Sequence, residues 1–343
     1  MINSKTTYVM MSGWARSGAA LTGAMINAHS KATLSVDILK YFNFCYKRYP
    51  NLDKDTLLVM LKEMHTRLKA RFGIDLDIEY CLRTIGNKLN HWFVYKVLLN
   101  HVVGHDSSQT IIGEYEGVVW SLIPEFLDNV TGSKAIIIVR DPRDVLVSFK
   151  KNTIAKKNDY LITVFNYLDL MNSWFRYEKQ YPDRVMCIRF EELKSNPKLT
   201  AQNIANFLDI EFEVSMLDSS KWEVLKNNNW EKWENHNSSS FRDNDELKVS
   251  PVGRWRDLID PVDHFICEWI LKDMMSKFGM LLEFSLPVNK YFPLAIERLM
   301  SSELLKEAFL NYAYNNKGSE KYPLDPCNSV NWDKGYIDNI ELL

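Results

Sequence analysis

A string of charged residues directly after an apolar run is the part of the sequence best suited to chemistry. Residues 135–139 read Ala-Ile-Ile-Ile-Val, and residues 140–144 read Arg-Asp-Pro-Arg-Asp. The apolar run predicts a buried strand of a parallel sheet, and Pro142 suits the first position of a following helix. Ser148 lies eight residues after Arg140, in the second turn of that helix. An arginine and a hydroxyl that converge at the carboxyl end of a strand suit a phosphate group.

A loop of small residues near the N-terminus has the layout of a phosphate cradle. Residues 7–11 predict a short strand, residues 12–18 read Ser-Gly-Trp-Ala-Arg-Ser-Gly, and a helix is expected from Ala19 to about His29. In such an arrangement the loop amides and the helix N-terminus point at an anion. The loop is not a Walker A motif, because no Gly-Lys-Ser/Thr follows, and Arg16 would supply the positive charge instead.

The elements around these two motifs predict an α/β fold with a central parallel sheet flanked by helices. Further strands are expected at residues 110–113 and 185–190, and helices at 122–129, 159–180, 200–208 and 262–278. Residues 36–92 look mostly helical and form a long insertion between the first helix and the next strand, while residues 93–99 fit a strand or a buried helix end. Residues 285–343 form a tail with one helix at 295–312, and the Asn-rich residues 226–246 predict a mobile loop.

Composition narrows the class of protein. The chain has 343 residues, of which 46% are hydrophobic, enough for one large domain or two small ones. Its formal net charge of −2 argues against a nucleic-acid binder. The five cysteines are scattered without a CxxC pair, which favours reduced thiols in a cytoplasm over a disulfide framework or a zinc site. We expect a soluble protein, because no apolar run approaches the ~18 residues of a membrane span and no signal peptide is evident.

Three segments resemble the motifs of sulfotransferases that use 3′-phosphoadenosine 5′-phosphosulfate (PAPS). Residues 13–18 are similar to the family's 5′-phosphosulfate loop, usually Gly-x-Pro-Arg-Ser-Gly-Thr-Thr, and residues 139–148 look like its 3′-phosphate motif. Residues 253–257, Gly-Arg-Trp-Arg-Asp, resemble the C-terminal phosphate loop of bacterial members. Weaker matches at residues 189–193, 196–197 and 207–208 fall in the family's order, so the resemblance covers roughly residues 7–284.

The resemblance implies a P-loop-type domain over residues 1–284, with the insertion at 36–92 on the acceptor side and a tail at 285–343 of unknown role. It implies PAPS as co-substrate, 3′-phosphoadenosine 5′-phosphate (PAP) as product, no metal, and an acceptor hydroxyl or amine, which we expect on a small molecule. The tail could support an oligomer. The cofactor-binding residues carried over are Gly13, Trp14, Ala15, Arg16, Ser17, Gly18, Ala19, Ala20, Arg140, Ser148, Phe190, Arg254, Trp255 and Arg256.

The sequence departs from the family pattern at several site positions. Ala15 replaces the loop proline, and Ala19 and Ala20 replace the two threonines, so Ser17 and Thr22 are the possible substitute hydroxyls. Phe190 stands where the family has an adenine-side tyrosine.

The family's Glu-Lys-Thr-Pro string is here Glu-Tyr-Glu-Gly at residues 114–117. The lysine that would stabilise the transferring sulfonate is therefore missing, and Lys96 or Arg16 are possible replacements. We expect Glu114 as the catalytic base and Arg16 as the charge that holds the leaving phosphate. Rival bases are Glu116, as the exposed alternative, and two histidines spaced i, i+4 that lack a third ligand for a metal site, His101 and His105.

Two other functions fit some of these residues. A nucleotide-binding module that has lost transfer chemistry would explain Ala19, Ala20 and Tyr115. A small-molecule kinase on a related fold would need the missing Gly-Lys-Ser/Thr and a magnesium carboxylate, and magnesium dependence would distinguish it.

Overall fold

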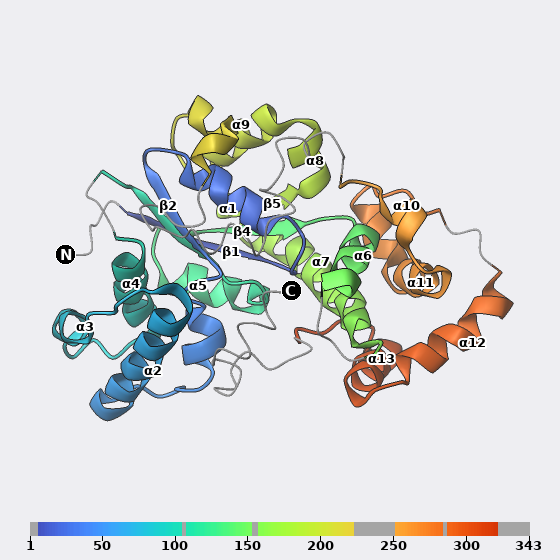
Figure 1. Cartoon of the computed structure of the whole chain (residues 1–343), viewed down its shortest axis with the longest axis horizontal. Coiled ribbons are helices and arrows are strands. Elements are labelled where there is room, and N and C mark those ends of the chain that lie inside the picture. The colour runs from blue at the N-terminus through green and yellow to red at the C-terminus, as the bar shows by residue number, and fades with distance from the viewer. Residues whose placement is uncertain (1–5, 105–107, 153–156, 223–250, 284–286, 322–343) are drawn as a thin grey trace.

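A five-stranded parallel sheet forms the centre of the protein, as seen in a computed structural model that describes residues 6–104, 108–152, 157–222, 251–283 and 287–321 (Figure 1). The strand order is β2-β3-β1-β4-β5, and every neighbouring pair is parallel. The strands are β1 (Thr7–Gly13), β2 (Ala32–Val36), β3 (Ile111–Tyr115), β4 (Lys134–Val139) and β5 (Val185–Arg189). The expectation of a parallel α/β fold is confirmed.

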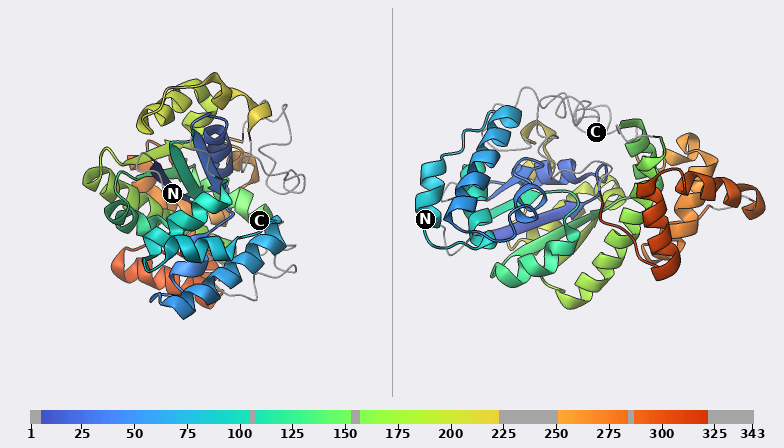
Figure 2. Two further views of the ribbon diagram at one scale, coloured as in Figure 1. Left: turned by 90° about the vertical axis from the view of Figure 1, so that its left-hand side faces the viewer. Right: turned by 90° about the horizontal axis from the view of Figure 1, so that it is seen from below.

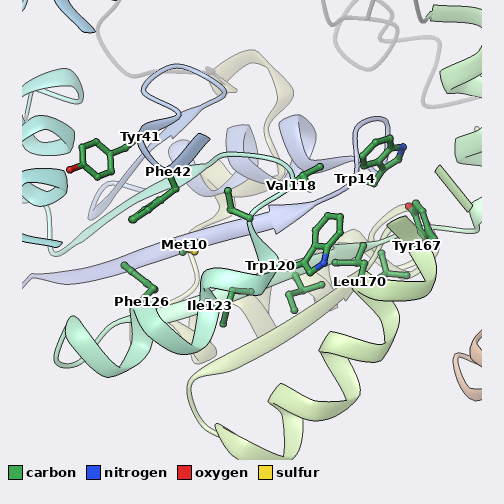
Figure 3. Packing of buried hydrophobic residues seen from close by; sticks show 14 of the residues in the cluster. Met10, Trp14, Tyr41, Phe42, Val118, Trp120, Ile123, Phe126, Tyr167 and Leu170 are labelled. Carbon is green, nitrogen blue, oxygen red and sulfur yellow. The ribbon is translucent and has the colours of Figure 1, made fainter. Parts of the chain in front are cut away.

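Both faces of this sheet are buried, which explains why its strands are apolar without alternation. Along β1, Val9 and Met11 point to one hydrophobic cluster, and Tyr8 and Met10 point to the other (Figure 3). The first cluster is covered by α1 (Ala19–Asn27), α8 (Phe190–Ser195) and α9 (Pro197–Phe207). The second is covered by α4 (His91–Val102), α5 (Ile123–Asn129) and α7 (Ile162–Gln180).

The helical insertion begins later and ends later than predicted. Strand β2 lies directly before it, where no strand was expected, because its buried Thr33 and Ser35 interrupt the apolar pattern. Residues 93–99 belong to α4, a helix that Asn90 caps by accepting the amides of Trp92 and Phe93. Between β2 and α4 lie η1 (Phe42–Tyr46), α2 (Lys54–Phe72) and α3 (Ile78–Ile85).

The remaining helices follow α4 in the chain, and those of its C-terminal third gather at the end of the molecule opposite α2 and α3 (Figures 1 and 2). They are η2 (Trp120–Leu122), α6 (Pro142–Asn152), η3 (Asp159–Leu161), η4 (Val214–Leu217), η5 (Ser219–Lys221), α10 (Trp255–Leu258), α11 (Pro261–Lys277), α12 (Val288–Leu299) and α13 (Glu303–Asn315). The single helix predicted at residues 295–312 is wrong. The chain breaks between α12 and α13 because Ser302 leaves the helical conformation and caps α13 through the amide of Leu305.

The described helices include none with the length and apolar character needed to cross a bilayer.

Candidate active site

The loop between β1 and α1 is a rigid turn that exposes the first amides of a helix. Arg16 adopts a left-handed conformation with φ of 69°, and Gly18 follows with φ of 98°. The hydroxyl of Ser17 donates to the carbonyl oxygen of Trp14 at 2.6 Å, which closes the turn. Helix α1 starts at Ala19, so the amides of its first turn have no acceptor within the helix and suit an anion.

Two side chains of this loop face the protein rather than a ligand. The indole of Trp14 is fully buried, donates to Thr163 Oγ1 at 3.1 Å and packs against Phe149. Thr22 Oγ1 donates to the carbonyl of Gly18, and Ser17 is engaged with Trp14. Both hydroxyls are therefore engaged with backbone carbonyls of the loop, and the indole of Trp14 anchors the loop to the core.

Arg16, Arg140 and Ser148 meet at the carboxyl edge of the sheet, as the sequence predicted. Arg16 Nε donates to Ser148 Oγ at 3.1 Å, and Arg140 Nη1 donates to the carbonyl of Arg16 at 3.0 Å. The pKa of Arg16 is lowered to about 10, mainly by burial and in addition by the guanidinium groups of Arg140 and Arg254. Three cations held this close together favour a bound polyanion.

Arg140 is fixed on several sides. Its guanidinium stacks 4.5 Å from the centre of the Phe190 ring, and Nη2 donates to the carbonyl of Pro251 at 2.6 Å. Phe190 also lies so close to Gly18 that a Cβ there would stand 2.3 Å from the ring. Phe190 therefore joins the loop to Arg140, in keeping with its predicted place at the site.

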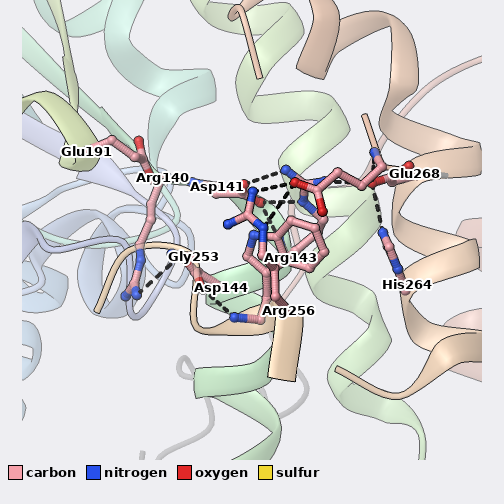
Figure 4. A network of polar contacts seen from close by, with 11 residues as sticks. Arg140, Asp141, Arg143, Asp144, Glu191, Gly253, Arg256, His264 and Glu268 are labelled. Carbon is pink, nitrogen blue, oxygen red and sulfur yellow. Dashed lines mark hydrogen bonds and ion pairs between the residues drawn. The ribbon is translucent and has the colours of Figure 1, made fainter. Parts of the chain in front are cut away.

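Asp144 holds the turn at Gly253 in place. We call Arg16, Arg140 and Arg254 the arginine cluster. Asp144 Oδ2 accepts the amide of Gly253 at 2.7 Å, and Oδ1 accepts the amide of Trp255 at 3.0 Å (Figure 4). Trp255 is buried with Arg143 3.8 Å from its ring centre, and Arg256 forms an ion pair with Glu283.

Within this turn, Arg254 interacts electrostatically with the other two arginines, because its positive charge lowers the pKa of both Arg16 and Arg140. In the described residues, the buried Nε atoms of Arg140 and Arg254 have no hydrogen-bond partner. Orphaned buried donors on two arginines fit a ligand with several anionic oxygens.

The two glutamates at the end of β3 are both buried, so the expectation of an exposed Glu116 is wrong. Glu114 Oε1 accepts the amide of Lys40 at 2.7 Å, and both carboxylate oxygens of Glu116 accept the amide of Phe42, the shorter contact being 2.9 Å. Burial raises the pKa of Glu114 well above its ordinary value, and the neighbouring Glu116 raises it further. Burial raises the pKa of Glu116 to about 7. The two carboxyl groups therefore titrate together as a pair, and burial raises the pKa values of both.

The residue after Glu116 is hydrogen-bonded to the start of the phosphate loop. This residue, Gly117, accepts the amide of Gly13 at 3.2 Å and the hydroxyl of Ser12 at 2.7 Å through one carbonyl oxygen. The carboxyl pair therefore lies at the end of the strand next to β1, whose end leads into the phosphate loop, and is covered by Lys40 and Phe42.

Lys96 and His101 lie away from this edge. Lys96 Nζ lies 5.6 Å from the ring centre of Tyr8, at the amino end of β1, about 17 Å of extended chain from Gly13. His101 contacts the amide of Asp77 in the insertion. Lys96, a possible replacement for the missing lysine, and His101, a rival base, are thus placed away from Arg16 and Arg140, and His105 lies outside the described residues.

The structure adds Tyr167, which gave no signal in the sequence, and gives a structural contact to Arg143 of the charged string. Tyr167, from α7, is fully buried beside Arg140, and Arg143 links Asp141 to Glu268 from α11 at 2.7 and 2.6 Å. Their roles depend on helices far apart in the sequence. The described residues hold no cluster of three metal-binding side chains, and residues 226–246 lie outside them.

Comparisons with known proteins agree with this geometry. The family model of the sulfotransferase domain matches residues 6–279. Sulfotransferase 2A1 of Rattus norvegicus is 29% identical over 142 residues, which are 36% of this chain and 50% of that protein. Cytosolic sulfotransferase 16 of Arabidopsis thaliana is 22% identical over 188 residues, 47% of this chain and 55% of that protein.

The chain thus spans about half the length of the curated relatives it matches. Among solved structures, the sulfotransferase domain from the curacin biosynthetic pathway is 17% identical, with a TM-score of 0.53 over 81% of this chain and 99% of that one. That likeness supports the fold. Because the family model covers most of the chain, the protein belongs to the sulfotransferase family.

Proposed function

We propose that this protein transfers a sulfonate group from PAPS to a hydroxyl or amine of a small-molecule acceptor. The observation that carries the proposal is the convergence of Arg16, Arg140 and Arg254 with Ser148 beside the first turn of α1. Family membership gives the reaction class, and the cluster supplies the charge that the reaction needs.

The two ends of the cluster serve the two phosphates of PAPS. Arg16 and the amides of residues 18–20 hold the leaving 5′-phosphate, where negative charge grows as the S–O bond breaks. Arg140, Ser148 and Arg254 hold the 3′-phosphate, which distinguishes PAPS from ordinary nucleotides. Gly13, Trp14, Ala15 and Ser17 shape the loop, and Trp255 and Arg256 fix the turn that carries Arg254.

The carboxyl pair of Glu114 and Glu116 takes the acceptor proton. A base must be ionised, and Glu116 is the member that ionises near neutral pH. Glu114 keeps its proton and supports Glu116. The proposal requires residues 40–43, whose amides cover both carboxyl groups, to move aside when the acceptor binds.

The acceptor is proposed to be small because the near-neutral charge balance of the chain does not indicate the broad basic surface that an acidic polysaccharide acceptor would need. The net charge is −2, which also disfavours nucleic acid as a partner. The chain is proposed to act in a cytoplasm and without a metal. An oligomer built on residues 285–343 is a further proposal.

The experiment is to incubate the protein with PAPS labelled on the sulfonate and a panel of hydroxyl and amine acceptors, and to detect sulfated products by mass spectrometry. Sulfated product and PAP in equal amounts, without added magnesium, are expected. Binding of PAP without product from the whole panel would favour a nucleotide-binding module, for which the engaged hydroxyls of Ser17 and Thr22 are an argument.

Two matched variants test the base. Glu116→Gln is expected to lower single-turnover transfer about 10²–10⁴-fold, the usual contribution of a general base. Glu114→Gln is expected to stay within about tenfold of the parent, because an amide imitates the protonated carboxyl. The opposite order, with PAP affinity unchanged in both, would give the role to Glu114 alone, as the sequence predicted.

A further inference from the structure

The segment that follows α13 returns to the catalytic domain and packs closely on α7. At Gly318 a Cβ would stand 2.4 Å from both the amide nitrogen of Asp169 and the carbonyl oxygen of Phe165, so only glycine allows this approach. The next residue, Ser319, donates its amide to that same carbonyl of Phe165 at 3.0 Å. The contact is therefore one of backbone on backbone, which tolerates little change.

A buried asparagine of α7 locks the end of this segment. Asn166 Nδ2 donates to the carbonyl of Lys321 at 2.7 Å, and Asn166 Oδ1 accepts the amide of Lys321 at 2.8 Å. Asn166 is fully buried, so both bonds are shielded from water. The side chain of Lys321 instead forms an exposed pair with Glu307 at 2.6 Å, which separates its role from that of its backbone.

The same segment reaches the turn that follows the carboxyl pair. Glu320 Oε1 accepts the amide of Ser121 in η2 at 3.2 Å. Trp120, in the same turn, is fully buried and donates to Asp169 of α7 at 2.8 Å (Figure 3). The turn from Gly117 to Leu122 is thus held by the phosphate loop at one end and by α7 with Glu320 at the other.

Helix α7 connects these contacts to the arginine cluster. Its Thr163 holds the indole of Trp14, and its Tyr167 is buried beside Arg140. Residues 163, 166, 167 and 169 therefore tie the cofactor side, the acceptor side and the segment after α13 to a single helix. The family model ends at residue 279, so this segment lies beyond the part of the chain that it matches.

We propose that residues 318–321 are a positioning element for the transfer step. They hold the turn from Gly117 to Leu122, which follows Glu116, at a fixed position relative to the phosphate loop. The proposal rests on the proposed function, since it names what aligns the carboxyl pair. Asn166, Gly318 and Glu320 act as positioning residues, through the turn and without touching either substrate. Small misplacements of a catalytic group cost much of the rate, so loosening this element lowers turnover more than cofactor binding.

The test compares Asn166→Ala and Glu320→Ala with two controls. Lys321→Ala removes only the exposed pair with Glu307, and Glu320→Gln keeps an oxygen to accept the Ser121 amide. Asn166→Ala and Glu320→Ala are expected to lower kcat about tenfold, with the Kd for PAP by calorimetry within twofold. Lys321→Ala and Glu320→Gln are expected to stay within twofold in both.

Hydrogen exchange at the amides of Val119 and Leu122, which bond to carbonyls inside the turn, gives a readout that needs no activity. Faster exchange there in Asn166→Ala and Glu320→Ala, but not in the controls, supports the positioning role. Unchanged exchange and unchanged kcat would overturn it, as would equal losses in kcat and PAP affinity. If Asn166→Ala does not fold, the exchange and kcat results for Glu320→Ala test the proposal by themselves. If the parent transfers no sulfonate, the proposed function fails, and the exchange data still decide whether the segment holds the turn.

Discussion

At the scale of single residues, the site is a balance of buried charges. Arg16, Arg140 and Arg254 repel one another in a desolvated setting, and within the described part of the chain Asp144 forms an ion pair with Arg140 at 4.0 Å. Such an arrangement costs stability in the free protein and is stabilised when an anion binds. The arginines are therefore the first residues to test.

Replacing Arg140 with alanine is expected to weaken PAP binding by about 1.5–3 kcal/mol, the range for hydrogen bonds to charged groups. The binding of adenosine 5′-phosphate, which lacks the 3′-phosphate, is expected to weaken much less. Calorimetry with both ligands makes the comparison, and Arg176→Ala, on the outer part of α7, is the control arginine. Equal losses for the two nucleotides would show that Arg140 does not recognise the 3′-phosphate.

The carboxyl pair predicts a pH dependence of stability with a definite sign. The pKa of Glu116 is raised from 4.5 to about 7 in the folded protein, so the folded state binds more protons than the unfolded state between these values. Its contribution to stability is therefore full below pH 4.5 and is lost as the pH rises to about 7. Glu114, whose pKa is raised further by burial and by Glu116, extends the loss to higher pH.

Denaturant unfolding of the parent and of Glu114→Gln at pH 5 and pH 8 measures this effect. The variant is expected to lose less stability than the parent over that interval, because its amide cannot ionise. A variant that follows the parent at both pH values would mean that Glu114 does not titrate as a buried acid.

At the scale of elements, short turns bring the charges together, and single carboxylates hold those turns. Asp144 in the first turn of α6 accepts two amides from residues 253–255, which are more than a hundred positions away in the sequence. Gly253 has φ of 80°, a conformation that favours glycine, so the turn is built for this approach. Helix α6 therefore both carries Ser148 and holds the turn that carries Arg254.

Replacing Asp144 with alanine distinguishes positioning from charge. Removing a negative charge beside the arginine cluster would strengthen PAP binding if electrostatics alone decided the affinity. We expect the opposite, about tenfold weaker binding, because two backbone amides of the turn that carries Arg254 lose the carboxylate that accepts them. Calorimetry with PAP gives the sign, and tighter binding would contradict the positioning argument.

At the scale of the whole molecule, the C-terminal helices are part of the folded domain, although the sequence suggested a separate tail. Asp263 of α11 is buried and accepts Arg298 of α12 as well as Lys150 of α6 and Tyr160 of η3. Helix α13 packs on α7, with the rings of Tyr312 and Phe165 centred 6.4 Å apart, and its Leu305 and Ala308 are buried. The protein is therefore expected to unfold in one transition that includes residues 287–321.

Replacing Asp263 with alanine is expected to lower the free energy of unfolding by about 2 kcal/mol, since it removes a carboxylate shared by three donors. Lys306→Ala breaks only an exposed pair with Glu303 at 3.5 Å and is expected to cost at most about 0.5 kcal/mol. Guanidinium unfolding monitored by tryptophan fluorescence measures both. Similar small effects for the two variants would show that α12 contributes little to the domain.

The sequence by itself determined the elements whose signals are local. The apolar run before Arg140 and the small-residue loop before α1 predicted β4, α6 and the phosphate cradle, because periodicity and turn chemistry depend on neighbouring residues. The same residues carried the resemblance that the family comparison confirmed.

The tertiary structure decided which side chains face the ligand and which face the core. Trp14 lies in the predicted loop, yet its indole is buried because Thr163 and Phe149 stand beneath it. Glu116 is polar and was expected at the surface, but it is buried against Phe42, whose backbone amide donates to its carboxylate. Such outcomes depend on contacts between segments tens to hundreds of positions apart, and no local pattern encodes them.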